Sequence, residues 1–222
     1  MPYAVLTGVV DMAPIPVVVE YAKGYLRTAI LRQIAKAYHL KTEKGVISVL
    51  TLGEIATGFS GIVHSTVKFL TSPWQHIKNF SHFTGLAEET ARTYAMAFLF
   101  ERYLEVTEAR YLGPKKALEI REAMDTAFFQ AAQIVIAPFF LVLRQFNPAV
   151  LFQMVRFSLR FVIPWARPGV RNGKNSSLLI NRLEKNSPNL LLLSTAFATA
   201  INMRGGTLKR SLEKGFFAKL AK

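Results

Sequence analysis

Two groups of carboxylates could in principle support acid–base chemistry. Their members stand three or four residues apart, the spacing that places side chains on one face of a helix: Glu101, Glu105, Glu108 and Glu119, Glu122, Asp125. A general acid or base would have to be held in a cleft that shifts its pKa. Arg102 and Arg110 stand close by in the sequence, and such mixed charge is typical of a solvated helix face. We therefore expect neither group to be catalytic.

Other reactive residue types are scarce or badly spaced. The four histidines, His39, His64, His76 and His82, form no pair with the spacing of a helical metal site. The chain has no cysteine, which removes disulfides, cysteine–zinc sites and thiol nucleophiles. It also has no glycine-rich phosphate loop and no nucleophile elbow. We expect a protein that is not an enzyme, with no catalytic, metal-binding or cofactor-binding residues and no cofactor.

Positive charge dominates the second half of the chain. The 222 residues have a net charge of +14. Residues 1–125 hold 14 Lys and Arg against 12 Asp and Glu, whereas residues 126–222 hold 14 against only Glu184 and Glu213. The asymmetry comes from a loss of acids and not from a gain of bases. Because soluble surfaces normally mix both signs, the second half is expected to face something anionic.

Proline and glycine positions divide the chain into helices. Pro114, Pro148 and Pro188 each stand where the first residue of a helix is expected. Breaks are expected at Pro138 and at Gly205-Gly206. Helices are expected over residues 17–39, 42–55, 62–70, 73–80, 86–112, 114–143, 149–163 and 188–203, and from 208 onward. A strand over 45–52 is the one alternative. The N-terminus lacks a secretory signal pattern. The predicted fold class is all-α, a multi-helix bundle with one or two apolar helices able to enter or line a membrane.

Two segments without formal charge, 126–143 and 186–203, are close to the length of a membrane span. They could be buried core helices, a membrane hairpin or two spans, or shallow interfacial helices. The basic residues between them favour a membrane, with this loop on the cytoplasmic or an equivalent internal face. The residues expected to bind an anionic surface here are Arg156, Arg160, Arg167, Arg171, Lys174, Arg182 and Lys185. Trp165 could lie in an interfacial aromatic belt.

The C-terminal tail has the pattern of a cationic amphipathic helix. Leu208, Leu212, Phe216 and Leu220 recur every four residues, and Phe217 adjoins them. Basic residues occupy the other positions: Lys209, Arg210, Lys214, Lys219 and Lys222. Such a helix can lie in a headgroup layer, with the apolar residues inserted and the basic residues on anionic lipid. The alternative is a terminal helix packed on its own domain, with a solvated basic face.

Several motifs in the first half resemble the YcjF-like domain of bacteria. They are Pro14-Ile15-Pro16, Arg32-Gln33-Ile34-Ala35-Lys36-Ala37-Tyr38-His39-Leu40, Leu52-Gly53-Glu54, Ala91-Arg92-Thr93-Tyr94-Ala95-Met96-Ala97 and Glu101-Arg102-Tyr103-Leu104-Glu105. His39 and Ala97 stand where glycines are common in that family. The resemblance, which covers residues 14–105, implies a helical membrane domain of unknown function, often encoded beside small GTPases. It implies membrane association and a GTPase partner, and no catalytic residue.

The sequence predicts a non-catalytic, membrane-associated helical adaptor or scaffold. Residues 1–125 would form a helical domain, and residues 126–222 a basic, apolar, membrane-associated region. Its partners would be anionic membrane lipids and proteins, either a GTPase or the subunits of a membrane complex. Two alternatives stay open. One is a structural subunit of a larger, even organellar, membrane complex, and the other is a basic nucleic-acid-binding protein.

Overall fold

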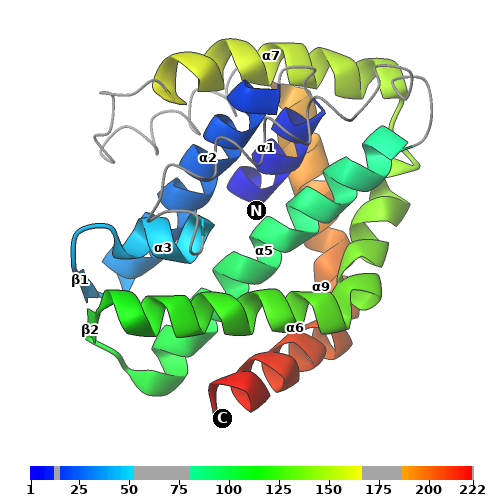
Figure 1. Cartoon of the computed structure of the whole chain (residues 1–222). Coiled ribbons are helices and arrows are strands. Elements are labelled where there is room, and N and C mark those ends of the chain that lie inside the picture. The colour runs from blue at the N-terminus through cyan, green and yellow to red at the C-terminus, as the bar shows by residue number, and fades with distance from the viewer. Residues whose placement is uncertain (13–15, 53–80, 167–186, 222) are drawn as a thin grey trace.

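The fold is all-α, as predicted. The computed structural model describes residues 1–12, 16–52, 81–166 and 187–221 (Figure 1). The helices in these ranges are α1 (Pro2–Asp11), α2 (Pro16–Ala37), α3 (Val46–Leu52), α5 (Ser81–Thr107), α6 (Pro114–Leu143), α7 (Pro148–Ala166) and α9 (Pro188–Leu220). The expected helix starts at Pro114, Pro148 and Pro188 are confirmed. The expected helices 62–70 and 73–80 lie outside the described residues.

Helix α1 lies in the middle of the bundle, although the sequence pattern did not predict it (Figure 1). Every residue from Tyr3 to Val10 is buried, and the helix contacts α2, α5, α7 and α9. A helix that is covered all round has no polar face, so it lacks the periodicity by which amphipathic helices are recognised. Gly8 allows α1 to approach α5 closely, because a Cβ there would lie 2.1 Å from the Thr90 Oγ1.

Helices α6 and α9 form the most extensive pair, and they run antiparallel. Ala127 of α6 lies against Gly215 of α9, whereas Phe139 stacks at a tilt on Phe197 with ring centroids 5.0 Å apart. The breaks expected at Pro138 and Gly205-Gly206 were wrong, since both helices continue through these positions. Packing along the whole length of the pair outweighs the hydrogen bond lost at proline and the flexibility of glycine.

The connection after α2 contains a two-residue strand, β1 (Lys41–Thr42), which pairs in parallel with β2 (Tyr111–Leu112). The helix expected from residue 42 therefore does not begin there, and α3 begins only at Val46. The strand considered over residues 45–52 is absent, because most of this stretch forms α3. Likewise α5 ends at Thr107 and not at residue 112, since the last two residues of the expected helix form β2.

Side-chain hydrogen bonds tie α3 to α6. The Arg121 guanidinium donates to the backbone oxygens of Leu50 and Thr51, at 3.0 and 2.9 Å, and so caps the end of α3. It also donates two hydrogen bonds to the Asp125 carboxylate, of 2.7 and 3.0 Å.

The domain division expected at residue 125 falls inside α6, and residues on both sides of it belong to one hydrophobic core.

Candidate functional site

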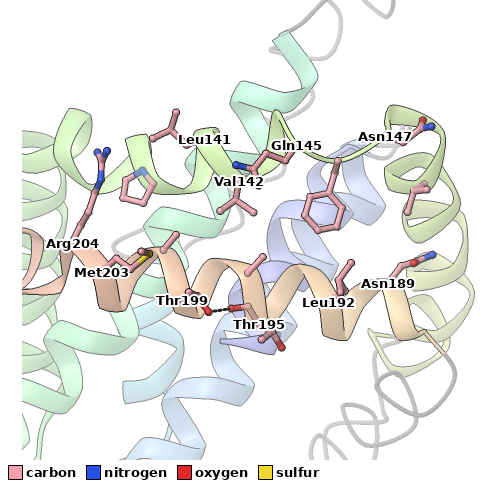
Figure 2. Close-up of a pocket in the computed structure, with 15 residues that line it drawn as sticks. Leu141, Val142, Gln145, Asn147, Asn189, Leu192, Thr195, Thr199, Met203 and Arg204 are labelled. Atoms are coloured by element: carbon pink, nitrogen blue, oxygen red, sulfur yellow. Dashed lines mark hydrogen bonds between the residues drawn. The ribbon is translucent and has the colours of Figure 1, made fainter.

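An open groove of about 780 Å³ lies where the end of α6, the start of α7 and the first half of α9 meet (Figure 2). Its lining is mainly apolar, and much of it comes from the two segments that the sequence marked as membrane candidates, with Phe146 and Val150 added by the connection to α7 and by α7 itself. The side chains that define it include Leu141, Val142, Phe146, Leu192, Ala196 and Met203. The helices place these residues side by side because α6 and α9 are antiparallel, so the C-terminal part of one lies beside the N-terminal part of the other.

Two of the polar side chains of the groove are satisfied within their own helix. The Thr195 and Thr199 hydroxyls donate to the carbonyl oxygens of Leu191 and Thr195, at 2.9 and 3.0 Å. Arg204 is the only charged residue in the lining, and it lies with Met203 at one end of the groove (Figure 2). Among its described residues the lining has no carboxylate, histidine or lysine, and its apolar side chains beside one arginine suit an apolar ligand with an anionic end.

Helices α6 and α9 also expose most of the large apolar side chains found on the surface. Among the described residues, eight large hydrophobic side chains are exposed, and six of them belong to these two helices. We call these six the apolar surface: Phe129, Ile134, Leu141, Leu191, Leu192 and Met203. Phe129 and Met203 are 84% and 83% exposed. Leu141, Leu192 and Met203 also line the groove, and exposed apolar side chains that gather in this way generally mark a surface that contacts a partner or a membrane.

Helix α6 is long and apolar enough to cross a membrane. It is the one helix of the described ranges that is, and 44% of its most apolar 18-residue window is buried inside the protein. Val135 and Phe139 point into the core, whereas Phe129 and Ile134 are exposed. In the segment 126–143, one face therefore packs in the core and the other is exposed. The described part of 186–203 is similar, since Leu193 and Phe197 lie on its buried face.

The tail forms the last part of α9, and its apolar face packs on the protein. Leu208, Leu212 and Phe216 are fully buried, and Phe217 and Leu220 are half-buried against the same core. This arrangement corresponds to the packed alternative considered for the tail. In this structure the three buried side chains contact protein, so they are not exposed to a headgroup layer.

The basic residues of the tail are exposed along α9. Lys209, Arg210, Lys214 and Lys219 all reach solvent, and the Lys209 Nζ lies 5.8 Å from the centre of the Phe98 ring. Arg156 is exposed on α7. Arg160 and Trp165 also belong to α7, but the surroundings of their side chains are not described. The remaining candidates lie outside the described residues: Arg167, Arg171, Lys174, Arg182, Lys185 and Lys222.

Three of the six carboxylates that first suggested chemistry are paired with cations: Glu105, Glu119 and Asp125. Arg102 holds Glu105 at 2.9 Å, and hydrogen bonds from Arg102 and from the Tyr38 hydroxyl lower the Glu105 pKa. Lys116 likewise lowers the pKa of Glu119. Lowered pKa values keep carboxylates ionised, which does not favour general acid catalysis at neutral pH. No cluster of three potential metal ligands occurs within the described ranges.

A partly buried ion cluster joins α1, α2 and α5. The Lys23 Nζ lies 2.8 Å from Asp11 and 2.7 Å from Glu20, and Arg27 pairs with Glu89. Burial is the largest cause that raises the Asp11 pKa; Lys23 lowers it, and the charges of Glu89 and Glu20 add to the rise. Burial lowers the Lys23 pKa, but the charges of Glu89 and Asp11 and the hydrogen bonds to Asp11 and Glu20 make the net shift upward.

Comparison with known proteins gives no relative from which a function could be transferred. No protein-family model matches the chain, and neither a curated protein nor a solved structure matches it. The resemblance to the YcjF-like domain therefore stays a prediction.

Proposed function

We propose that this protein is a non-catalytic, membrane-associated helical adaptor, and that the apolar surface on α6 and α9 contacts the lipid. The observation that carries the proposal is the concentration of exposed apolar side chains on these two helices, beside a groove whose only charged residue is Arg204. Moving such side chains out of water contributes about 25 cal/mol per Å² of apolar area. Partial insertion of the six side chains would therefore stabilise the bound state.

The charges on α9 support the same orientation. Beyond Arg204 the helix exposes Lys209, Arg210 and Lys214, whereas its one acid, Glu213, is paired with Arg102 at 3.1 Å. Each basic residue close to an anionic leaflet contributes on the order of 1 kcal/mol. The apolar side chains and the cations thus belong to one continuous helix, so that both could contact the membrane together.

Vesicle sedimentation tests the proposal. The full-length protein is expected to pellet with vesicles of phosphatidylcholine and phosphatidylglycerol. Leu192→Gln and Met203→Gln should each reduce the bound fraction severalfold, because each removes an exposed apolar side chain of the apolar surface. Val106→Gln is the matched control, since Val106 is 54% exposed but belongs to α5. The proposal fails if the protein stays in the supernatant, or if the control variant loses as much binding.

The adaptor role rests on two further considerations. The groove is lined by no carboxylate, histidine or lysine among its described residues, which suits binding and not turnover. A GTPase partner is implied only by the resemblance of residues 14–105 to the YcjF-like domain. If the apolar surface is instead covered by other subunits of a membrane complex, the protein should bind vesicles weakly and purify as part of a larger particle.

A further inference from the structure

A second hollow, of about 740 Å³, lies between the end of α2, β1 and the start of α3. Its lining differs sharply from that of the groove, because five of its residues carry basic side chains. We call this hollow the basic pocket, after Arg32, Lys36, His39, Lys41 and Lys44. All five side chains are exposed to solvent. Several cations that converge on one concave surface repel one another unless an anion lies between them.

The protein supplies little negative charge to balance these residues. Glu43 is the only acid in the lining, and its Oε1 accepts a hydrogen bond from the Tyr111 hydroxyl. None of the four Lys and Arg side chains forms an ion pair within the part of the chain that the structure describes. By contrast, Lys23 and Arg121 are both held by carboxylates. The basic pocket is therefore the place where unpaired cations and a cavity coincide.

The backbone around the pocket is held in a defined conformation. Helix α2 ends with paired hydrogen bonds, from the His39 N to the Lys36 O at 3.2 Å and from the Leu40 N to the Ala35 O at 2.8 Å. This termination puts His39 at φ 52°. The pairing of β1 with β2 then fixes Lys41 and Thr42. The cations thus project from an ordered turn, which reduces the entropy lost when they close on a ligand.

We propose that the basic pocket binds a compact anion that carries two or more phosphate groups. Its volume lies within the range of about 300–1,000 Å³ that is usual for small-molecule sites. Phosphate oxygens match the planar fork of Arg32, and the lysines add point charges. Single-stranded nucleic acid fits less well, because no Phe, Tyr or Trp is among the described residues that line the pocket, and these are the usual platforms for stacked bases.

The basic pocket is independent of the proposed membrane surface. It adjoins β2, which immediately precedes α6, whereas the groove begins at Pro138 near the other end of that helix. The 24 steps from Pro114 to Pro138 correspond to a separation of about 36 Å along the helix. Loss of ligand binding at one site should therefore leave the other unchanged.

Calorimetric titration of the full-length protein with tripolyphosphate tests the proposal. We expect saturable binding to the wild type. Arg32→Gln combined with Lys36→Gln should weaken it at least about tenfold, since each removed cation forfeits a charge-assisted hydrogen bond. Lys214→Gln combined with Lys219→Gln removes the same charge from exposed positions of α9, and should leave binding within about twofold of wild type.

A second experiment, with vesicles, tests whether the phosphate groups belong to a lipid headgroup or to a soluble ligand. Vesicles of phosphatidylcholine with and without a phosphatidylinositol bisphosphate are compared for the wild type and the Arg32→Gln, Lys36→Gln variant, because Lys214 belongs to the proposed membrane contact and cannot serve as a control here. Preference for the phosphorylated lipid that depends on Arg32 and Lys36 would assign the phosphates to a headgroup, and binding of tripolyphosphate alone would assign them to a soluble ligand. The proposal is overturned if neither probe binds saturably, or if the α9 control loses as much affinity for tripolyphosphate as the pocket variant.

Discussion

Gly8 of α1 and Thr90 of α5 lie so close that a single added methyl group could not fit between the helices. A Cβ on Gly8 would lie 2.1 Å from the Thr90 Oγ1 and 2.5 Å from the backbone oxygen of Leu86. The second of these atoms belongs to the backbone, so the helices themselves would have to separate. This contact fixes the central helix against α5, and α1 in turn contacts α2, α7 and α9.

Gly8→Ala should therefore lower the free energy of unfolding by about 1–3 kcal/mol, the usual cost of overpacking a core. Chemical denaturation monitored by circular dichroism measures the change. Gly205→Ala is the control, because an added Cβ would meet nothing within 4 Å there and alanine favours a helix by about 0.5–1 kcal/mol. A stable Gly8→Ala variant would show that α1 does not pack as described.

Lys23 is expected to stabilise the junction of α1, α2 and α5. Its side chain is only 8% exposed and lies between Asp11 and Glu20. Lys23→Met should cost about 3 kcal/mol, because it leaves partly buried carboxylates without a counter-charge. Adding Asp11→Leu should recover part of the loss. Lys116→Met, which breaks the exposed pair with Glu119, should cost less than about 1 kcal/mol in the same denaturation experiment.

His39 adopts a left-handed backbone conformation that glycine accepts at no steric cost. Its φ is 52°, at the position of a helix C-terminus where glycine is common. His39→Gly should raise the free energy of unfolding by about 0.5–1 kcal/mol, as relief of the backbone strain exceeds the entropy that glycine loses on folding. Glu108, with φ 49°, should respond in the same direction, whereas Lys36→Gly inside α2 should destabilise.

Tyr94 should make the stability fall at alkaline pH. Burial, with a contribution from Glu101, raises the pKa of Tyr94 to about 12. The unfolded chain ionises this hydroxyl near its ordinary value of about 10, so it releases the proton first. Stability is therefore lost as the pH rises from about 10 to 12. The tyrosinate absorbance of the wild type should show this late titration, and Tyr94→Phe should remove it and flatten the fall in stability.

A substitution at Leu212 distinguishes a C-terminal tail that packs on the protein from a tail that acts as a free amphipathic helix. It is fully buried, as are Leu208 and Phe216. Leu212→Ala should lower the free energy of unfolding by about 2–5 kcal/mol in the absence of lipid. Lys214→Ala on the exposed side should change it by less than about 0.5 kcal/mol. If Leu212→Ala had no effect without vesicles but weakened vesicle binding, the tail would act as a membrane helix.

The sequence alone determined the helical class and several helix starts. Pro114, Pro148 and Pro188 begin helices because proline at the first position loses no hydrogen bond, a local property that the surroundings do not alter. The alternation of apolar and basic residues in the tail was also readable, since it depends only on helical periodicity. The loss of acids after Asp125 likewise needed no structure.

Only the tertiary structure decided which apolar residues are covered. It buried Leu208 and Leu212 and left Leu192 and Met203 exposed, although all four belong to α9. The antiparallel packing of α6 on α9 determines which of these side chains are buried. The same packing keeps both helices continuous at Pro138 and at Gly205-Gly206. The basic pocket joins residues of α2, β1 and α3 around a turn whose shape depends on pairing with β2. Contacts between distant segments set these features, and local sequence patterns do not encode them.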